Sequence, residues 1–294
     1  MAAQLIDGRK IAEQIHSETK ARVDKLKIKG ITPGITFIRV GEDPASQAYV
    51  RMKGKKAAEL GIHSDTIVLD EKTTQKDLLE LIDRLNADTN VHGILVQAPL
   101  PSHISETVVF SYVNPHKDVD GFHPINVGKL MLGETTGFKP CTPAGVHELL
   151  IRSQVPTEGA EVVVLGRGNI VGKPMASILI QKFKNANSTV TVLHSRSKNI
   201  EEHCQRADII IAAMGFAHFV KASMVKPGAT VIDVGVNRIE DKNDPRGYRL
   251  VGDVDFEAVS QVAGKITPNP GGVGPMTIAL LMSNTVQAAE TLSH

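Results

Sequence analysis

A tyrosine and a lysine in the first half of the chain have polar groups and a spacing that places both on one face of a helix. Tyr49 and Lys53 are four positions apart in a stretch with a helical pattern, so both side chains would project from one face of the helix. Val50, Gly54 and Ala57 would form a separate apolar stripe suited to packing. Lysine can act as a base only if burial or a nearby positive charge lowers its pKa. A solvent-exposed amphipathic face is the alternative interpretation of this pair.

Two further polar features follow the next strand pattern. Gln97 ends the apolar stretch 92–97, and ligands of open α/β sheets gather where strands end. Its amide is either a structural hydrogen-bonding group or part of a site. Asp118 and Asp120 precede Gly121, and paired acids before glycine often make only a turn.

The second half contains a glycine-rich loop between a strand pattern and a helix pattern. Gly166 and Gly168 would allow a tight turn and the close approach of a phosphate, and Pro174 suits the first turn of the helix. Amides at the N-terminus of that helix would bind a pyrophosphate. The spacing to Gly172 is one residue longer than in the usual dinucleotide fingerprint. A plain strand-to-helix turn is the alternative.

The end of the following strand favours NADP over NAD. An NAD site usually has Asp or Glu there for the ribose 2′-hydroxyl. This chain has the segment 194–197, His-Ser-Arg-Ser, and its Ser195 and Arg196 suit a 2′-phosphate instead. Arg167 could add a second positive charge. Arg196 could also be a solvated loop residue.

These segments lie in an alternation of strand and helix patterns that predicts an α/β protein. Strands that are apolar throughout are buried on both faces, which indicates a parallel sheet flanked by helices. The predicted strands are 35–40, 63–69, 92–97, 161–166, 188–194, 208–214 and 229–235. Residues 100–140 are rich in proline and glycine, and a domain boundary is expected near the helix that opens with Thr142 and Pro143. A last glycine-proline loop, 267–277, opens the final helix.

The composition excludes several classes of function. The chain has 294 residues and a net charge of +1, and only 4% of its residues are aromatic, so neither nucleic acid nor an anionic membrane is an expected partner. Cys141 and Cys204 form no metal-spaced pair and no disulfide framework, so no metal is expected. A reducing compartment is the simplest interpretation. No targeting segment or membrane span is evident, which makes the cytoplasm the expected location.

Five motifs in order resemble one known family. They are Tyr49-Val-Arg-Met-Lys53, Val91-His-Gly-Ile-Leu-Val-Gln97, Lys117-Asp-Val-Asp-Gly121, Gly166-Arg-Gly-Asn-Ile-Val-Gly-Lys-Pro174 and Pro270-Gly-Gly-Val-Gly-Pro-Met-Thr277. Together they resemble the bifunctional methylenetetrahydrofolate dehydrogenase/methenyltetrahydrofolate cyclohydrolases over nearly the whole chain. The resemblance implies two domains with the active site in a cleft between them. Residues 1–140 plus 276–294 would form the folate-binding catalytic domain, and residues 141–275 a Rossmann-like, doubly wound NADP-binding domain.

The resemblance also implies the reactions and the roles of individual residues. 5,10-Methylenetetrahydrofolate would be oxidised by NADP⁺ to the methenyl cation, which water opens to 10-formyltetrahydrofolate. Lys53 would be the catalytic base, Gln97 would orient it, Tyr49 would stack on the aminobenzoyl ring and Asp120 would anchor the pterin. Further folate contacts would come from Val96, Ala98, Pro270, Gly271, Gly272 and Val273. NADP contacts would come from Gly166, Arg167, Gly168, Ser195, Arg196, Val236 and Thr277.

Members of this family are typically homodimers in one-carbon metabolism, which implies a homodimer and a link to purine biosynthesis. The chain departs from the family at Gly168, Ala98 and Asn269, where Ser, Leu and Val are usual, and these positions affect the expected cofactor affinity and pocket shape. Two other functions remain as alternatives. One is an NADP-dependent dehydrogenase of another small substrate, and the other is a non-catalytic module that senses NADP(H).

Overall fold

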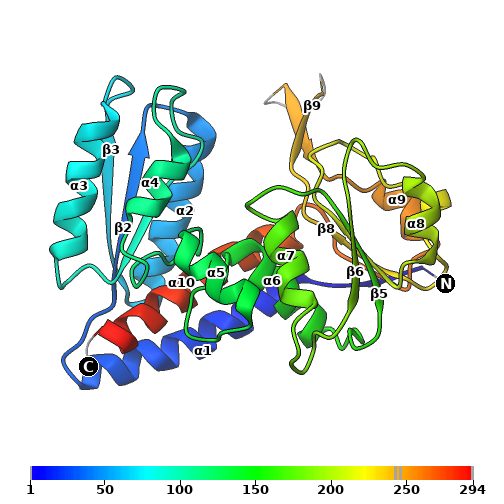
Figure 1. Cartoon of the computed structure of the whole chain (residues 1–294), viewed down its shortest axis with the longest axis horizontal. Coiled ribbons are helices and arrows are strands. Elements are labelled where there is room, and N and C mark those ends of the chain that lie inside the picture. Colours follow the sequence, from blue (N-terminus) through cyan, green and yellow to red (C-terminus); the bar gives the residue numbers. More distant parts are fainter. Residues whose placement is uncertain (1, 242–243, 245–246, 293–294) are drawn as a thin grey trace. The chain divides into compact units, whose positions relative to one another are not determined.

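A computed structural model describes residues 2–241, 244 and 247–292 (Figure 1). The chain divides into two compact units. One comprises Met1–Ala12 and Thr142–Thr277, and is called the sheet unit below. The other comprises Glu13–Cys141 and Ile278–His294, and is called the lysine unit. No helix in the described parts of the chain has the length and apolar character needed to cross a membrane.

The lysine unit contains a three-stranded parallel sheet in the order β3-β2-β4. β2 (Gly34–Val40) is buried along its whole length because it lies between the other two strands. β4 (Gly93–Val96) is also buried, whereas β3 (His63–Leu69) alternates toward solvent as an edge strand. The expectation of burial on both faces therefore fails for β3, whose polar residues His63, Ser64 and Asp65 fit the edge position.

The helix that carries Lys53 begins and ends at residues that cap it. α2 (Pro44–Leu60) begins where the carboxylate of Asp43 accepts the N–H of Ser46 at 2.7 Å, and ends at Gly61 in the left-handed conformation. The other helices with their larger part in this unit are α1 (Gly8–Ile28), α3 (Gln75–Ala87), α4 (Glu106–Tyr112), α5 (Pro124–Leu132) and α10 (Val273–Leu292). α4 and α5 lie in the segment that was expected to consist mainly of loops.

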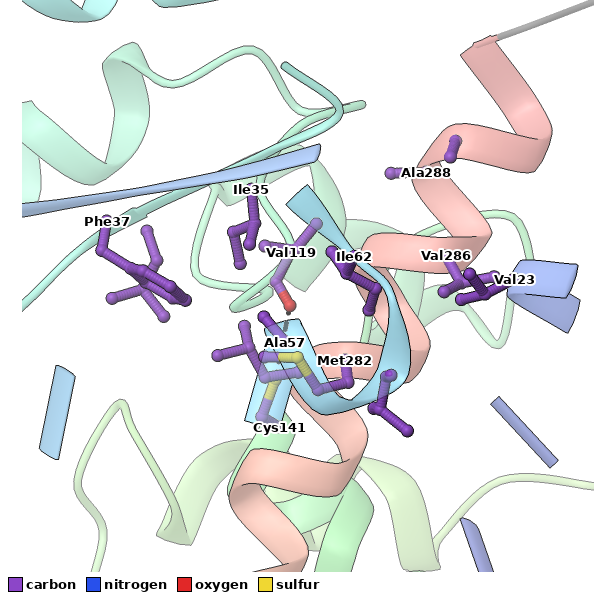
Figure 2. Packing of buried hydrophobic residues seen from close by; sticks show 14 of the residues in the cluster. Val23, Ile35, Phe37, Ala57, Ile62, Val119, Cys141, Met282, Val286 and Ala288 are labelled. Atoms are coloured by element: carbon purple, nitrogen blue, oxygen red, sulfur yellow. Dashed lines mark hydrogen bonds between the residues drawn. The ribbon is translucent and has the colours of Figure 1, made fainter. Parts of the chain in front are cut away.

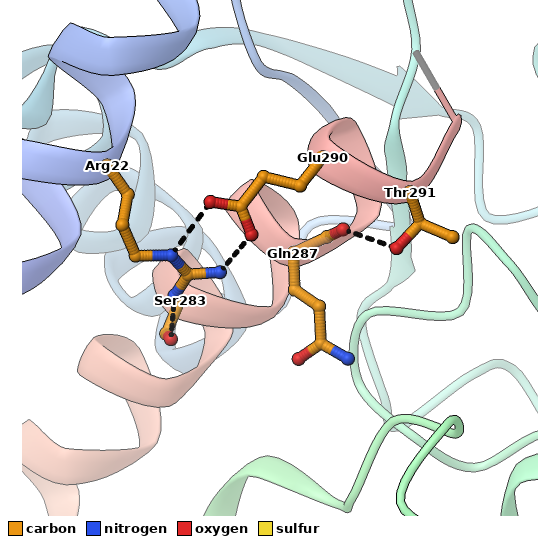
Figure 3. A network of polar contacts seen from close by, with 5 residues as sticks. All are labelled: Arg22, Ser283, Gln287, Glu290 and Thr291. Atoms are coloured by element: carbon orange, nitrogen blue, oxygen red, sulfur yellow. Dashed lines mark hydrogen bonds and ion pairs between the residues drawn. The ribbon is translucent and has the colours of Figure 1, made fainter. Parts of the chain in front are cut away.

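The final helix packs into the core of the lysine unit. Met282 and Val286 of α10 lie in one apolar cluster with Phe37 of β2 and Ala57 of α2 (Figure 2). Arg22 of α1 also binds α10: its Nε and Nη2 donate to the carboxylate of Glu290 at 3.0 and 2.7 Å, and its Nη1 to Ser283 Oγ at 2.9 Å (Figure 3). A half-buried bidentate pair of this kind fixes the two helices more specifically than a single surface contact.

The sheet unit is built on a six-stranded parallel sheet in the order β1-β11-β8-β7-β5-β6. Its strands are β1 (Gln4–Leu5), β5 (Glu161–Leu165), β6 (Thr189–Leu193), β7 (Ile209–Ala212), β8 (Thr230–Asp233) and β11 (Lys265–Ile266). The helical segments are α6 (Cys141–Arg152), α7 (Gly172–Leu179), α8 (Ile200–Arg206), η1 (Ala222–Met224) and α9 (Phe256–Val259). An antiparallel hairpin, β9 (Asn237–Glu240) with β10 (Tyr248–Val251), completes the unit.

All seven predicted strands are present, and the predicted α/β class with a doubly wound parallel sheet is confirmed. The compact units differ from the expected domains at the N-terminus. Residues 1–140 were expected to begin the catalytic domain, but β1 pairs in parallel with β11 and so joins the sheet of the other unit. A strand of two residues carries too little pattern to be recognised in the sequence.

Candidate active site

Lys53 belongs to the buried stripe of α2. The stripe consists of Ser46, Val50, Lys53, Ala57 and Leu60, and Lys53 itself is only 4% exposed. The separation of Lys53 from the apolar stripe was therefore wrong, and so was the alternative of a solvated lysine. Spacings of three and four residues alternate along the stripe, which keeps all five side chains on one face. The amine is thus held inside the lysine unit.

A glutamine and a tyrosine contact the buried amine. Nζ of Lys53 donates to Oε1 of Gln97 at 3.0 Å and lies 4.4 Å from the centroid of the Tyr49 ring. Gln97 follows β4, and its Nε2 donates to the carbonyl of Ala98 at 2.7 Å, which fixes its amide with the oxygen toward the lysine. A neutral amine that gives one N–H to Gln97 keeps its lone pair for another proton.

Burial lowers the pKa of Lys53 from its ordinary value, while the negative charge of Asp120 opposes that shift. Burial likewise raises the pKa of Asp120, and the charge of Lys53 acts in the opposite direction. The net result is an amine that loses its proton more readily than a lysine in water. The structure therefore brings together Tyr49, Lys53, Gln97 and Asp120, all from the lysine unit.

The two acids of the motif at 117–121 have different surroundings. The carboxylate of Asp118 accepts backbone N–H groups from Gly121, Phe122 and His123 at 3.2, 3.2 and 2.8 Å, and Nδ2 of Asn126 at 2.9 Å. Burial nevertheless raises the pKa of Asp118 to about 7. Asp118 thus builds the turn, and the turn leaves Asp120 free to interact electrostatically with Lys53. The turn interpretation therefore holds for Asp118, and a binding role for Asp120 stays a prediction.

Two residues near Asp120 were not predicted. The thiol of Cys141 donates to the carbonyl of Val119 at 3.3 Å (Figure 2). Nδ2 of Asn284 in α10 donates to the same carbonyl at 2.9 Å and to that of Lys139 at 3.3 Å. Burial raises the pKa of Cys141 well above its ordinary value, so the thiol stays neutral. A buried amide in an otherwise apolar helix stripe is a signal that could have identified Asn284.

Val96 lies in the hydrophobic core, in one cluster with Ile38 and Leu78, and Ala98 is partly exposed. The loop residues Pro270, Gly271, Gly272 and Val273 lie in the sheet unit, where Gly272 packs closely against Gly8. The contacts of these six residues with folate stay predictions.

The glycine loop of the sheet unit leaves no room for side chains at two positions. A Cβ at Gly166 would lie 2.2 Å from the carbonyl oxygen of Ala213, and one at Gly172 would lie 2.2 Å from that of Gly166. Gly166 also has a φ of +119°, which favours glycine. Gly168 has open space around it. The loop follows β5, next to β7, where the order of strands reverses and α/β proteins bind dinucleotides.

The turn after β6 fits a phosphorylated ribose. Ser197 Oγ accepts the N–H of His194 at 3.0 Å, and His194 Nδ1 accepts that of Arg196 at 3.2 Å. These bonds close the turn and leave the side chains of Ser195 and Arg196 exposed, as is Arg167 in the glycine loop. Serine and arginine in place of a carboxylate suit NADP.

The two remaining residues predicted to bind the cofactor also lie in the sheet unit. Val236 is 70% exposed beyond β8, and Oγ1 of Thr277 lies 3.0 Å from that of Thr142. Within the described residues, groups of three or more His, Cys, Asp or Glu do not gather as a metal site.

The fold and the site define an α/β enzyme of the dinucleotide-binding class, with a buried lysine as its candidate base. The chain belongs to the tetrahydrofolate dehydrogenase/cyclohydrolase family: the model of the family's catalytic domain matches residues 6–120, and that of its NAD(P)-binding domain matches residues 140–293. This confirms the resemblance drawn from the five motifs.

Similar proteins cover the whole chain. The bifunctional protein FolD of Prosthecochloris aestuarii is 56% identical over 97% of both chains, and that of Lawsonia intracellularis is 56% identical over 98% of both. The structure of the bifunctional enzyme FolD from Campylobacter jejuni covers 99% of each chain, with 48% identity and a TM-score of 0.93. The Trypanosoma brucei enzyme, solved with NADP cofactor and an inhibitor, shares 40% identity with a TM-score of 0.93, covering 99% of this chain and 98% of its own.

Proposed function

We propose that Lys53 is the base of a bifunctional methylenetetrahydrofolate dehydrogenase and methenyltetrahydrofolate cyclohydrolase. The enzyme oxidises 5,10-methylenetetrahydrofolate with NADP⁺ and hydrolyses the resulting 5,10-methenyltetrahydrofolate to 10-formyltetrahydrofolate. The observation that carries the role of Lys53 is its amine, buried at 4% exposure and hydrogen-bonded to Gln97.

In the hydrolysis, water adds to the methenyl carbon and loses a proton to Nζ of Lys53. The hydroxyl of this adduct then loses its proton as the C–N bond to the pterin ring nitrogen breaks. That nitrogen takes a proton, and the formyl group remains on the other nitrogen. One proton is released for each turnover. The lowered pKa of Lys53 supplies the neutral amine that the first step needs, and binding of the cationic substrate favours this form further.

The other residues of the lysine unit position the folate. Gln97 holds the amine, Tyr49 offers its ring to the aminobenzoyl group, and Asp120 anchors the pterin while its charge limits the fall of the Lys53 pKa. Further folate contacts are assigned to Val96 and Ala98 in this unit and to residues 270–273 in the sheet unit.

In the dehydrogenase reaction, NADP⁺ supplies the hydride acceptor. Gly166, Arg167 and Gly168 receive its pyrophosphate, Ser195 and Arg196 receive its 2′-phosphate, and Val236 and Thr277 contact it further along. Two observations support this assignment of the cofactor contacts. Gly168 leaves open space where the order of strands reverses, and the turn after β6 contains no carboxylate. Positioning accounts for most of the hydride step, because no covalent bond to the protein is needed.

We further propose that the folate domain is residues 1–140 with 276–294 and the NADP domain residues 141–275. The enzyme acts as a cytoplasmic homodimer, and its product donates formyl groups to purine biosynthesis. The two buried free cysteines suit a reducing compartment. Light scattering on the purified protein would give twice the chain mass for the dimer.

One assay tests the main proposal. Purified protein mixed with methylenetetrahydrofolate and NADP⁺ should produce methenyl absorbance that decays as the formyl product forms. Turnover without folate, or binding of NADPH without any folate turnover, would contradict it.

A further inference from the structure

Two buried carboxylates of the sheet unit take no part in the chemistry described above. Asp233 ends β8, and Asp253 follows β10; they are 3% and 1% exposed. Buried carboxylates are costly unless hydrogen bonds compensate for the lost water. The hydrogen-bond partners of the two carboxylates therefore indicate their role in the structure.

Asp253 binds a run of consecutive backbone amides. Its Oδ2 accepts the N–H groups of Met214 and Gly215 at 2.6 and 2.9 Å, and its Oδ1 accepts that of Phe216 at 3.0 Å. Oδ1 also accepts Nδ2 of Asn237 at 2.8 Å. One carboxylate thus fixes the whole segment 214–216 and ties it to the first residue of β9.

Asp233 fixes Asp253 in turn. Its Oδ1 accepts the N–H of Asp253 at 2.9 Å and that of Gly235 at 3.0 Å, and its Oδ2 accepts that of Val254 at 3.2 Å. A Cβ at Gly252 would lie 1.7 Å from Asp233 Oδ2, and one at Gly235 would lie 2.1 Å from Asp253 Oδ1. The backbone therefore approaches both carboxylates as closely as only glycine allows.

The segment held by Asp253 lies at the switch point of the sheet. It follows β7, and the carbonyl of Ala213, directly before it, is the group that leaves no room for a Cβ at Gly166. The segments after β5 and β7 thus form two neighbouring walls where α/β sheets bind dinucleotides. Val236, which lies between β8 and Asn237, is also exposed.

We propose that Asp253 is a positioning residue for NADP, because its carboxylate holds residues 214–216 as the wall of the cofactor site opposite the glycine loop. The inference rests on the proposed binding of NADP where β5 and β7 end. The amides of 214–216 all point to Asp253, so this wall offers the cofactor no N–H donors, and the phosphates are bound by the glycine loop and the start of α7. Asp233 supports Asp253 without reaching the segment itself.

The test is Asp253→Asn, which keeps the shape of the side chain but replaces one accepting oxygen with an N–H₂ group facing N–H donors. We expect KM for NADP⁺ and Kd for NADPH to rise about tenfold, because charged hydrogen bonds are lost. The cyclohydrolase rate, assayed from methenyltetrahydrofolate without cofactor, should stay at the wild-type value. Asp255→Asn is the matched control: it removes a partly exposed ion pair with Lys221 and should leave KM for NADP⁺ unchanged.

An unchanged KM and Kd in Asp253→Asn would overturn the inference. So would a parallel loss of both activities with an unchanged KM, since a purely structural role lowers only the fraction of folded enzyme. If Asp253→Asn does not fold, Asn237→Ala removes one of the four donors and decides the matter: a rise of about twofold or more in KM supports the inference, and no rise overturns it. Failure of the wild-type protein to bind NADPH would contradict the proposed function itself.

Discussion

The candidate sites of the lysine unit and the sheet unit depend on different kinds of group, side chains in the first and backbone atoms in the second. Around Lys53 the groups are side chains, and burial changes their pKa values. Around Gly166 the backbone determines the shape of the site, because Gly166 has a positive φ and the carbonyl of Ala213 approaches it closely. The side chains of Ser195 and Arg196 are exposed. The first arrangement suits proton transfer, which needs a tuned pKa, and the second suits a ligand that is bound along its length.

This difference predicts how the two sites respond to substitution. In the lysine unit, removal of one functional group should affect chemistry with little change of fold. In the sheet unit, a methyl group added at a closely packed glycine should affect the fold, and removal of an exposed side chain from the turn after β6 should affect only the choice of cofactor.

The largest effect is expected from Lys53→Met. The variant keeps an unbranched buried side chain but has no base, so the cyclohydrolase kcat should fall by about 10²–10⁴-fold. Lys56→Met is the control, since Lys56 forms ion pairs with Glu59 and Glu13 outside the site. Equal rates in the two variants, measured by loss of methenyl absorbance, would remove Lys53 from the mechanism.

Gly166→Ala should strongly lower the free energy of unfolding of the sheet unit. Its Cβ would meet the carbonyl of Ala213 at 2.2 Å at a φ of +119°, so we expect more than about 3 kcal/mol to be lost from the free energy of unfolding. Gly168→Ala has open space and should change that free energy by less than about 1 kcal/mol. Urea unfolding of both variants measures the difference, and similar midpoints would contradict a backbone-controlled loop.

Arg196→Ala should change cofactor choice rather than fold. Loss of a charged hydrogen bond to the 2′-phosphate would raise KM for NADP⁺ by about 10- to 100-fold and leave KM for NAD⁺ unchanged. Arg206→Ala is the control, because Arg206 is the last residue of α8, just before β7, and so lies at the amino ends of the parallel strands, whereas Arg196 follows the carboxyl end of β6. Initial rates with both cofactors give the comparison; equal losses would place Arg196 outside the phosphate site.

The smallest effect is expected from Asp120→Asn on the pH dependence. The cyclohydrolase rate should rise with pH as Lys53 loses its proton, and the charge of Asp120 raises the pKa of Lys53. Its removal should therefore move the rising limb of the profile to lower pH, even if the rate itself falls. A limb that stays in place or moves to higher pH would show that Asp120 does not act on Lys53.

Much of the fold could be predicted because long apolar strands carry a strong pattern. The seven predicted strands have at least four residues each, whereas β1 and β11 have only two, and the hairpin strands β9 and β10 are short and mostly exposed or half-buried. The place of Gln4 and Leu5 in the sheet could not be predicted for the same reason, since only the pairing of β1 with β11 shows it.

The site could be predicted in part. Residue types and spacing made Tyr49, Lys53, Gln97 and the glycine loop candidates, and the resemblance supplied their expected roles. The burial of Lys53 depends on how α2 packs, which its own sequence does not determine. The separate roles of Asp118 and Asp120 follow from the path of the turn. Asn284 and Cys141 reach Val119 from segments far away in the chain, so local patterns could not place them.

The central claim is that Lys53 provides a neutral amine at the active site. The pKa of Lys53 can be measured directly by NMR. The protein is produced with ¹³C-labelled lysine residues and its spectra are recorded over a range of pH, and the signal of Lys53 is assigned by its absence in Lys53→Met. The account predicts that Lys53 titrates below 10.5, the ordinary value for lysine, and that its titration coincides with the rising limb of the cyclohydrolase profile. A Lys53 signal that titrates at or above 10.5 would contradict it.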